Sequence, residues 1–172
     1  MARKHALLSA SSAARWIACP PSARLNAEQS DTPSEYAAQG TDAHTLCEYK
    51  LRKALGERVR DPTKHLTSYD TEMEECAEAY CQFVMEQVEQ FRAESKDTMV
   101  SVEQRVDFSA FVPDGFGTAD TLIISGKKVC IVDYKHGKGI EVSADHNPQM
   151  MCYALGCIQM FDGLYDTDEV RM

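Results

Sequence analysis

The hydrophobic pattern of this chain changes its period once, near Lys96, and that change limits the folds it can form. Between residues 68 and 94, apolar side chains recur at intervals of three and four, at positions 73, 76, 77, 80, 84, 88 and 91. Such spacing is typical of one face of a long amphipathic helix. After Lys96 the stretch 100–108 alternates apolar and polar residues, which indicates a strand. Helices followed by strands predict an α+β domain.

The remaining segments complete an α/β (α+β) plan in which a central mixed sheet is flanked by helices. Further helices are expected at 9–19, capped by Ser9 or Ser11, at 34–55, interrupted near Gly40 and ended by Gly56, and at 144–161. Further strands are expected at 118–125, at 129–134 and from 168, and the first three strands form a meander at the centre of the sheet. The domains are then an N-terminal helical region, 1–98, and a core, 99–172. Because the last strand stops at the final residue, we expect the natural chain to be longer.

The charge balance restricts the function. The chain has 18 Lys and Arg residues against 27 Asp and Glu residues, a net charge of −9. Proteins that hold nucleic acid mainly by neutralising phosphates are usually basic, so a protein that coats DNA with its whole surface is excluded. An enzyme that gathers carboxylates around a divalent metal ion is not excluded. Most of the acids are expected to lie on solvated helix faces.

Neither a membrane span nor a disulfide framework is expected. No apolar run in the sequence approaches the roughly 18 residues that a membrane helix needs. The seven cysteines are an odd number without a Cys-x-x-Cys pair, which favours a reduced, cytoplasmic protein. We expect buried thiols rather than a zinc or iron–sulfur site.

An acid and a lysine stand at the polar end of a mostly apolar strand, in Val129-Cys-Ile-Val-Asp133-Tyr-Lys135. Side chains two residues apart share a face of a strand, so Asp133 and Lys135 point to one place. A carboxylate can ligate Mg²⁺ or Mn²⁺, while an ammonium group beside it orients a water molecule or stabilises charge on a phosphate. Taken alone, the pattern is also that of a strand end with solvated charges.

A second acid, Asp120, lies on the preceding strand. If the strands 118–125 and 129–134 form a hairpin about Gly126-Lys127, Asp120 pairs directly with Asp133. Two like charges that face each other destabilise a sheet unless a cation lies between them. This pairing therefore favours a metal site.

Two of the expected helices carry polar pairs one turn apart. His44 and Glu48 are spaced by four residues, as are Gln149 and Tyr153, so each pair shares a helix face. A lone histidine is usually structural, and Glu48 is expected to be solvated or to be a partner of the histidine. Gln149 and Tyr153 could both face the polar end of the sheet.

Taken in order, these motifs resemble those of the PD-(D/E)XK nuclease superfamily and, within it, of the RecB-like exonuclease branch. That branch has Gly-x-x-x-His on a helix, Gly-x-x-Asp on a strand, Asp-Tyr-Lys on the next strand and Gln-x-x-x-Tyr on a helix. The matching segments here are Gly40-Thr-Asp-Ala-His44, Gly117-Thr-Ala-Asp120, Asp133-Tyr134-Lys135 and Gln149-Met-Met-Cys-Tyr153. The chain is also similar to an uncharacterised phage-associated branch, through Phe116-Gly-Thr-Ala-Asp, Lys135-His-Gly-Lys-Gly and Asn147-Pro-Gln.

The resemblance implies a restriction-endonuclease-like core that hydrolyses phosphodiester bonds in DNA with one or two Mg²⁺ or Mn²⁺ ions. The metal ligands that it implies are His44, Asp120, Asp133 and the backbone carbonyl of Tyr134, with Glu103 as an optional ligand of a second ion. Lys135 would position the attacking water, while Gln149 and Tyr153 would contact the DNA backbone or hold the lysine. We expect an exonuclease of phage or prophage recombination, with DNA, a phage recombination protein and further copies of the chain as expected partners.

Some relatives hold an iron–sulfur cluster through one cysteine before the histidine helix and three after the Gln-x-x-x-Tyr helix. Here Cys19 could be the first, but Cys157 is the only cysteine after Tyr153, so no cluster is expected within this chain. Lys138 is expected to meet a DNA phosphate or to lie in a solvated loop. Two other functions stay open: a catalytically inactive protein of this fold that binds DNA or serves in assembly, and a metal-binding protein unrelated to nucleases.

Overall fold

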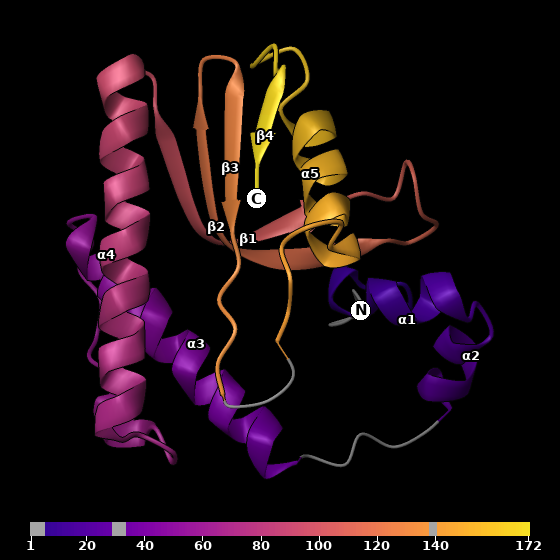
Figure 1. The fold of residues 1–172 in the computed structure, drawn as a ribbon, viewed down its shortest axis with the longest axis horizontal. Helices are drawn as coiled ribbons and strands as arrows, with labels where there is room; N and C mark the ends of the chain where they lie inside the picture. The colour runs from indigo at the N-terminus through magenta and orange to yellow at the C-terminus, as the bar shows by residue number, and fades with distance from the viewer. Residues whose placement is uncertain (1–5, 29–33, 138–140) are drawn as a thin grey trace.

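The computed structural model describes residues 6–28, 34–137 and 141–172, and the fold below refers to these. Along the chain the elements are η1 Ala10–Ser12, α1 Ala13–Ala18, α2 Ser22–Ala27, α3 Glu35–Ala54, η2 Thr63–His65, α4 Thr71–Glu94, β1 Met99–Asp107, β2 Phe116–Ser125, β3 Lys128–Val132, α5 Pro148–Met160 and β4 Glu169–Arg171. Helices therefore precede a segment made mostly of strands, as the change of period near Lys96 predicts (Figure 1).

The strands form one mixed sheet in the order β1-β2-β3-β4. The β1–β2 and β2–β3 pairs are antiparallel, whereas β4 pairs with β3 in parallel. The expected meander is confirmed, but β1 lies at an edge of the described sheet rather than at its centre. The register pairs Thr121 with Val132 and Ser125 with Lys128, so the hairpin turns at Gly126 as expected, where φ is 55° and glycine is favoured.

Helices cover both faces of this sheet. In Figure 1, α3 and α4 lie on the left of the strands and α5 lies on their right. Adjacent residues of a strand point to opposite faces, so Ile123 packs against α3 and α4 while Leu122 and Ile124 pack under α5. Each of these fully buried side chains stabilises the fold by roughly 1.5–3 kcal/mol. The expected mixed sheet with helices on its flanks is confirmed.

Side-chain caps fix the N-terminal ends of the three long helices, α3, α4 and α5. Ser34, Asp70 and Asn147 each accept a hydrogen bond from a backbone N–H of the following first turn. Because Asn147 caps and Pro148 begins the helix, α5 starts at residue 148 and not near 144. The interruption expected near Gly40 is wrong, since α3 runs through it without a break; a glycine inside a helix costs only about 1 kcal/mol.

The N-terminal segment differs most from expectation. The first helix is confirmed only in part: it divides into η1 and α1, and neither Ser9 nor Ser12 makes the side-chain cap. Helix α2 was not predicted at all, because its sequence, Ser22-Ala-Arg-Leu-Asn-Ala, shows no apolar period over one and a half turns.

All seven cysteines are free, and five of them are buried, as expected of thiols that pack as small hydrophobes. In the described ranges, no helix combines the length and the apolar character needed to cross a bilayer.

Candidate metal centre

Strand β2 loses its alternation at Asp120. Ala119 packs in the cluster beneath α5 together with Ala10 of η1, whereas the hydroxyl oxygen of Thr121 lies 2.7 Å from that of Tyr80 on α4. Residues two apart in a regular strand point to the same face, so the strand switches faces between them. The Asp120 side chain consequently lies on the side of the sheet where α3 contacts it.

Strand β1 is distorted at the same place. The pairs Val102–Thr121 and Gln104–Ala119 set Glu103 directly across from Asp120. Glu103 has a φ of 53°, in the left-handed region that residues other than glycine rarely adopt. Such a conformation costs on the order of 1–3 kcal/mol and is found most often at functional sites. The distortion brings two carboxylates together rather than apart.

Three side chains converge at this distortion. His44 of α3, Glu103 of β1 and Asp120 of β2 each offer one ligand atom, and these atoms all lie within 4.8 Å of one another. Asp120 is buried, and the other two side chains are partly exposed. Two carboxylates and one imidazole are a donor set for a divalent cation. We call these three residues the metal-ligand group.

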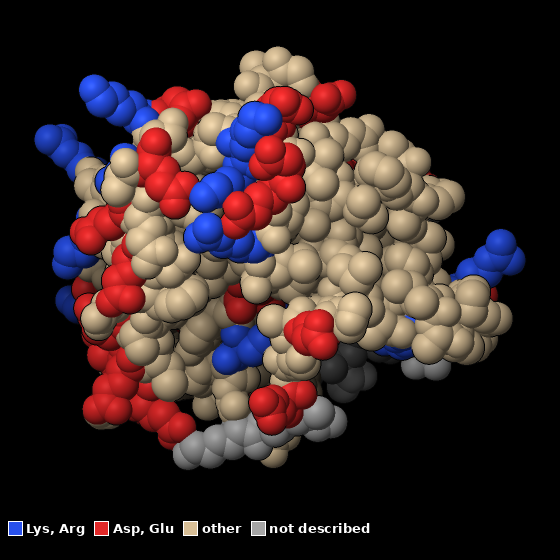
Figure 2. Space-filling view, turned by 45° about the horizontal axis from the view of Figure 1, so that its top comes forward, with Lys and Arg blue, Asp and Glu red and all other residues tan. Residues whose placement is uncertain are grey.

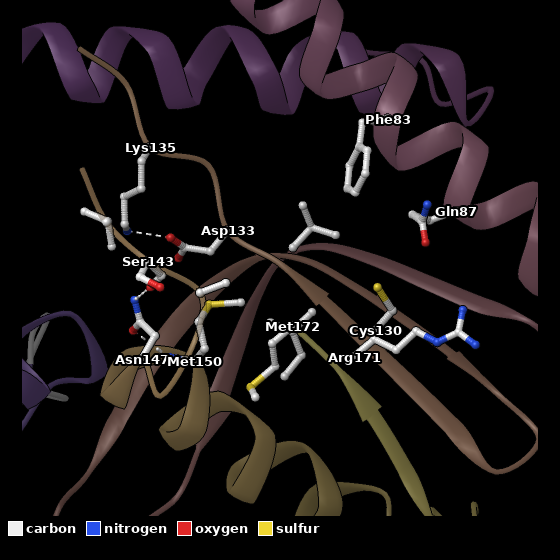
Figure 3. Close-up of a pocket in the computed structure, with 14 residues that line it drawn as sticks. Phe83, Gln87, Cys130, Asp133, Lys135, Ser143, Asn147, Met150, Arg171 and Met172 are labelled. Atoms are coloured by element: carbon white, nitrogen blue, oxygen red, sulfur yellow. Dashed lines mark hydrogen bonds and ion pairs between the residues drawn. The ribbon is translucent and has the colours of Figure 1, made fainter. Parts of the chain in front are cut away.

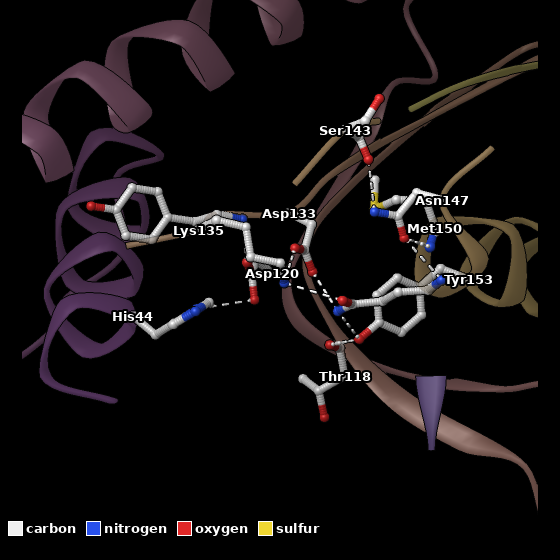
Figure 4. A network of polar contacts seen from close by, with 11 residues as sticks. His44, Thr118, Asp120, Asp133, Lys135, Ser143, Asn147, Met150 and Tyr153 are labelled. Atoms are coloured by element: carbon white, nitrogen blue, oxygen red, sulfur yellow. Dashed lines mark hydrogen bonds and ion pairs between the residues drawn. The ribbon is translucent and has the colours of Figure 1, made fainter. Parts of the chain in front are cut away.

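The histidine of this group is oriented by Asp120. His44 Nδ1 lies 3.2 Å from Asp120 Oδ1 (Figure 4). This hydrogen bond raises the pKa of His44 above its ordinary value, although burial acts in the opposite direction. The ring also packs edge-on against Tyr134, with 5.7 Å between ring centroids. Cation binding would require the neutral imidazole, so it would be coupled to loss of this proton.

The charge of the group's glutamate is only partly compensated, by His44 and Arg52. Burial, followed by the negative charge of Asp120, raises the pKa of Glu103 to about 7. A carboxyl group that shares a half-buried site with another carboxylate holds its proton more tightly, because both charges are incompletely solvated. A divalent cation would offset both negative charges. The residues of this site therefore fit a cation.

The second oxygen of Asp120 ties this group to the end of β3. Asp120 Oδ2 accepts a hydrogen bond from the backbone N–H of Tyr134, with an N–O distance of 2.6 Å. The backbone pairing of β2 with β3 ends at Val132. Beyond that residue, the hydrogen bond from Tyr134 to the Asp120 side chain keeps the two strands connected. The expected register between Asp120 and Asp133 is thus confirmed, although Asp133 lies just beyond the strand.

Asp133 is held by a closed ring of polar contacts. Its side chain is 6% exposed, and its Oδ2 lies 2.5 Å from Lys135 Nζ. Gln149 donates from Nε2 to Asp133 Oδ1 at 2.8 Å, and Gln149 Oε1 accepts from Lys135 Nζ at 3.1 Å. Burial, with the charge of Asp120 second, raises the pKa of Asp133 in spite of the ammonium group. The ring fixes the position of the lysine (Figure 4).

Tyr153 supports this ring from the sheet. Its hydroxyl donates to the backbone oxygen of Thr118 at 2.6 Å and accepts from Gln149 Nε2 at 3.3 Å. Gly117 leaves room for the ring, since a Cβ there would lie 2.9 Å from Cε1 of Tyr153. Tyr153 is 2% exposed, so the expected contact with DNA does not fit this side chain. Its contacts instead fit the other expected role, because they hold the glutamine that holds Lys135.

A family model covers residues 5–172, almost the whole chain. Its description reads "Protein of unknown function (DUF2800)". The chain belongs to the DUF2800 family. No solved structure matches it. Membership of this family assigns no activity, so the function has to be argued from the site.

Most residues expected of the site come together in this DUF2800 chain. The metal-ligand group adjoins the ring of contacts around Asp133, because Asp120 accepts a hydrogen bond from the backbone of Tyr134, the residue between Asp133 and Lys135. The carbonyl of Tyr134 as a ligand stays a prediction, and Lys138 lies outside the described residues. Glu48 does not contact His44; it pairs with Arg52, whose Nε lies 2.8 Å from Glu48 Oε1.

Two supporting residues were not predicted. Arg52 donates from Nη2 to the backbone oxygen of Val102 at 3.0 Å and so holds β1 next to Glu103. Its spacing of four from Glu48 indicates the ion pair within the helix but not the contact with the strand. Thr118 acts through its backbone oxygen, for which no sequence signal exists.

A cavity of about 230 Å³ adjoins Asp133. Its walls include Phe83 of α4 and Asn147 and Met150 at the start of α5. In Figure 3, Asp133 and Lys135 lie at one end of this cavity and Arg171 lies at the other. The ring around Asp133 therefore borders open space on the side of the cavity.

Proposed function

We propose that this chain is a metal-dependent deoxyribonuclease of the PD-(D/E)XK type, in which the metal-ligand group and Lys135 act on one phosphodiester bond. The observation that supports this most strongly is the convergence of His44, Glu103 and Asp120 within 4.8 Å, at a site that also lies next to Lys135. Residues of four motifs that are far apart in the sequence, His44, Asp120, Asp133 and Gln149, lie at or beside this site, which supports the proposal. A cluster of solvated charges would not need the left-handed conformation of Glu103.

The proposed ligands are His44, Glu103 and Asp120, with Asp133 beside them. A Mg²⁺ or Mn²⁺ ion bound there would polarise the phosphate and lower the pKa of a bound water. Carboxylates suit either ion, while the imidazole favours Mn²⁺ over Mg²⁺. With Glu103, the site has three carboxylates, the other two being Asp120 and Asp133. This number suits one or two divalent ions.

Lys135 supplies the charge that the transition state requires. Its side chain is 45% exposed, and its ammonium group lies against Asp133 and Gln149, so the lysine is held in place while part of its side chain stays open to a phosphate. A preorganised cation next to a developing negative charge lowers the barrier without further rearrangement. Gln149 is a positioning residue, because it binds both Asp133 and Lys135.

DNA as the substrate and exonuclease action in phage or prophage recombination rest on the resemblance of the motifs. They are part of the same proposal. The inactive alternative would keep the fold and the DNA contacts without hydrolysis, and the experiment below separates the two.

The test compares variants that keep the fold. Linear single-stranded and double-stranded DNA are incubated with Mg²⁺, Mn²⁺, Ca²⁺ or Zn²⁺ and with the wild type, Asp133→Asn or Lys135→Ala. A matched control is the pair Lys127 and Asp168, which lie 3.4 Å apart at the β2–β3 turn, away from the site. We expect Lys135→Ala to lower the cleavage rate by about 10²–10³-fold, and Lys127→Ala and Asp168→Asn to leave it unchanged.

Two outcomes would overturn the proposal. Equal cleavage by Lys135→Ala and Lys127→Ala would remove the site from the reaction. A folded wild type that cleaves neither DNA with any of the four ions would refute nuclease activity, and DNA binding in that case would support the inactive alternative.

A further inference from the structure

The N-terminal segment has a charge opposite to that of the whole chain. Residues 1–28 contain four basic residues, Arg3, Lys4, Arg15 and Arg24, against one acid, Glu28, within a chain of net charge −9. Figure 2 shows acidic side chains gathered on the left, on the side of α4, while the right is mostly uncharged. A local basic region on an acidic protein is a mark of contact with a polyanion.

The described part of this segment encloses a polar cleft. The cleft lies between η1–α1 and α2 and has a volume of about 970 Å³. The residues that line it include three serines and two arginines: Ser9, Ser11, Ser12, Arg15 and Arg24. Guanidinium and hydroxyl groups are the side chains that most often contact phosphate oxygens. Glu28 also lines the cleft, which leaves it a net positive charge.

In the part of the chain that the structure describes, the two arginines of this cleft have no carboxylate partner. With its amide oxygen turned toward Arg15, Asn26 accepts from Nη1 at 2.6 Å and from Nη2 at 2.9 Å. This partner is uncharged, so it fixes the guanidinium group and leaves its charge available. Among the residues that the structure describes, no carboxylate forms an ion pair with Arg15 or with Arg24.

The serines of the cleft are held in place as well. Trp16 donates from Nε1 to the backbone oxygen of Ser9 at 2.9 Å, and the hydroxyl oxygens of Ser9 and Ser12 lie 2.8 Å apart. These contacts fold η1 and α1 into one unit. The cleft is therefore formed before any ligand binds, which reduces the entropy lost on binding.

The cleft is attached to the strand that carries Asp120. Ala10 of η1 packs where β2 passes Tyr153, so that a Cβ on Gly117 would lie 3.0 Å from the Ala10 Cβ. Gly117 precedes Asp120 by three residues of the same strand, which corresponds to about 10 Å. Helix η1, which forms one wall of the cleft, is thus attached to β2 three residues from Asp120.

We propose that this cleft, which we call the N-terminal cleft, binds backbone phosphates of the DNA substrate away from the bond that is cut. The inference rests on the proposed function for the identity of the ligand, and it adds a second, non-catalytic contact to that function. Arg15 and Arg24 supply the charge, and the serine hydroxyls supply further donors. The acidic body of the protein then meets DNA only at this cleft and at the metal site.

The test measures DNA binding without hydrolysis. The full chain is titrated against fluorescently labelled duplex and single-stranded DNA in Ca²⁺, at salt concentrations from 50 to 200 mM, with fluorescence anisotropy as the readout. The variants are Arg24→Gln, which changes only an exposed side chain, and the double variant Arg15→Gln/Arg24→Gln. The control is Arg58→Gln/Arg60→Gln, which has the same change of charge in exposed residues after α3, on the other side of the molecule (Figure 1).

We expect the double variant to lower the slope of log K against log salt by about 1.8 for duplex DNA and about 1.4 for single strands. The Kd of the double variant at low salt should rise by roughly tenfold. Arg24→Gln alone should give about half of the change in slope. The control pair should leave the slope unchanged. Lysine at both positions should restore most of the binding, since it keeps the charge.

Several results would overturn the inference. Equal losses in the cleft variants and in the control pair would show general electrostatic attraction without a site. Unchanged binding in the folded double variant would exclude the cleft from DNA binding, as would binding to phosphatidylserine vesicles but not to DNA. The two proposals remain separable: cleft-dependent binding without cleavage refutes only the nuclease, and cleavage with unchanged binding in the cleft variants refutes only the cleft.

Discussion

Replacing Glu103 by glutamine should stabilise the metal-free protein and weaken its stabilisation by metal. The pKa of Glu103 is raised from 4.5 to about 7 by burial and by Asp120. A group whose pKa is higher in the folded state favours folding at low pH, and this contribution is lost as pH rises from about 4.5 to about 7. At pH 8 the ionised glutamate is therefore a cost to the metal-free protein, and the neutral amide removes that cost.

The size of this effect follows from the shift. One pKa unit corresponds to about 1.4 kcal/mol, so the whole shift corresponds to about 3 kcal/mol before solvent is considered. Because the glutamate is only about half-buried, screening reduces the expected gain to roughly 1 kcal/mol. For a chain of this size, that gain raises Tm by about 2–4 °C.

The assay is thermal unfolding in EDTA and in Mn²⁺, at pH 5 and at pH 8. We expect Glu103→Gln to raise Tm at pH 8 in EDTA and to change it little at pH 5. Saturating Mn²⁺ stabilises a protein by about 2.7 kcal/mol at a hundred times Kd, and the wild type should gain more of this than the variant. Glu89→Gln, an exposed acid of α4, is the control. An identical Tm for wild type and variant in EDTA at pH 8 would show that the ionised Glu103 does not destabilise the fold, and equal gains in Mn²⁺ would show that Glu103 does not bind the ion.

Three further predictions concern the same region. Tyr153→Phe leaves the Thr118 carbonyl and Gln149 without their hydroxyl partner, so urea unfolding should show a loss of about 1–2 kcal/mol; an unchanged midpoint would contradict the assigned contacts. Gly156→Ala places a Cβ 2.4 Å from Val106 Cγ1 and 2.8 Å from a backbone oxygen, so it should lower the free energy of unfolding by about 1–3 kcal/mol. Gly40→Ala, whose Cβ would have no atom within 4 Å, should raise it by up to about 1 kcal/mol. Equal effects of the two substitutions would show that the Gly156 position is not tightly packed. The affinity for Mn²⁺, measured by calorimetry, should rise between about pH 6 and pH 8, because the raised pKa of His44 and of Glu103 makes protons compete with the ion; an affinity independent of pH would exclude both residues as ligands.

The sequence predicts the parts of this fold that depend on local patterns. The turn at Gly126 sets the β2–β3 register, and the apolar period of residues 73 to 91 sets α4. The turn alone places Asp120 across from the end of β3. The start of α5 could have been predicted more closely, since Asn147-Pro148 is a stronger signal of a helix start than the apolar residues before it.

Other features have no local signal. Glu103 lies in a strand that alternates normally in sequence, so nothing near it predicts a left-handed φ. That conformation depends on the opposite strand, and pairing across strands is a tertiary property. Helix α2 is equally hidden, because it is too short for a period and is held by packing against α1. The basic segment 1–28 is visible in the sequence, but only the structure shows that two of its arginines share a cleft.

The distortion at Glu103 and Asp120 is better explained by cation binding than by packing. If the alternation set by Leu122 and Ile124 continued, Asp120 would face the apolar cluster beneath α5, where an unpaired carboxylate is strongly destabilising. An apolar residue at position 120 would remove that cost without distorting either strand. The chain instead keeps a carboxylate that is turned toward His44 and opposes it with a second one, and it retains both the like-charge repulsion and the strained φ of Glu103. Within the residues that the structure describes, His44 and Arg52 offset part of this negative charge, and a divalent ion held by both carboxylates would offset the rest. We therefore expect the stability of the folded protein to depend on metal more than on any single packing contact in this site.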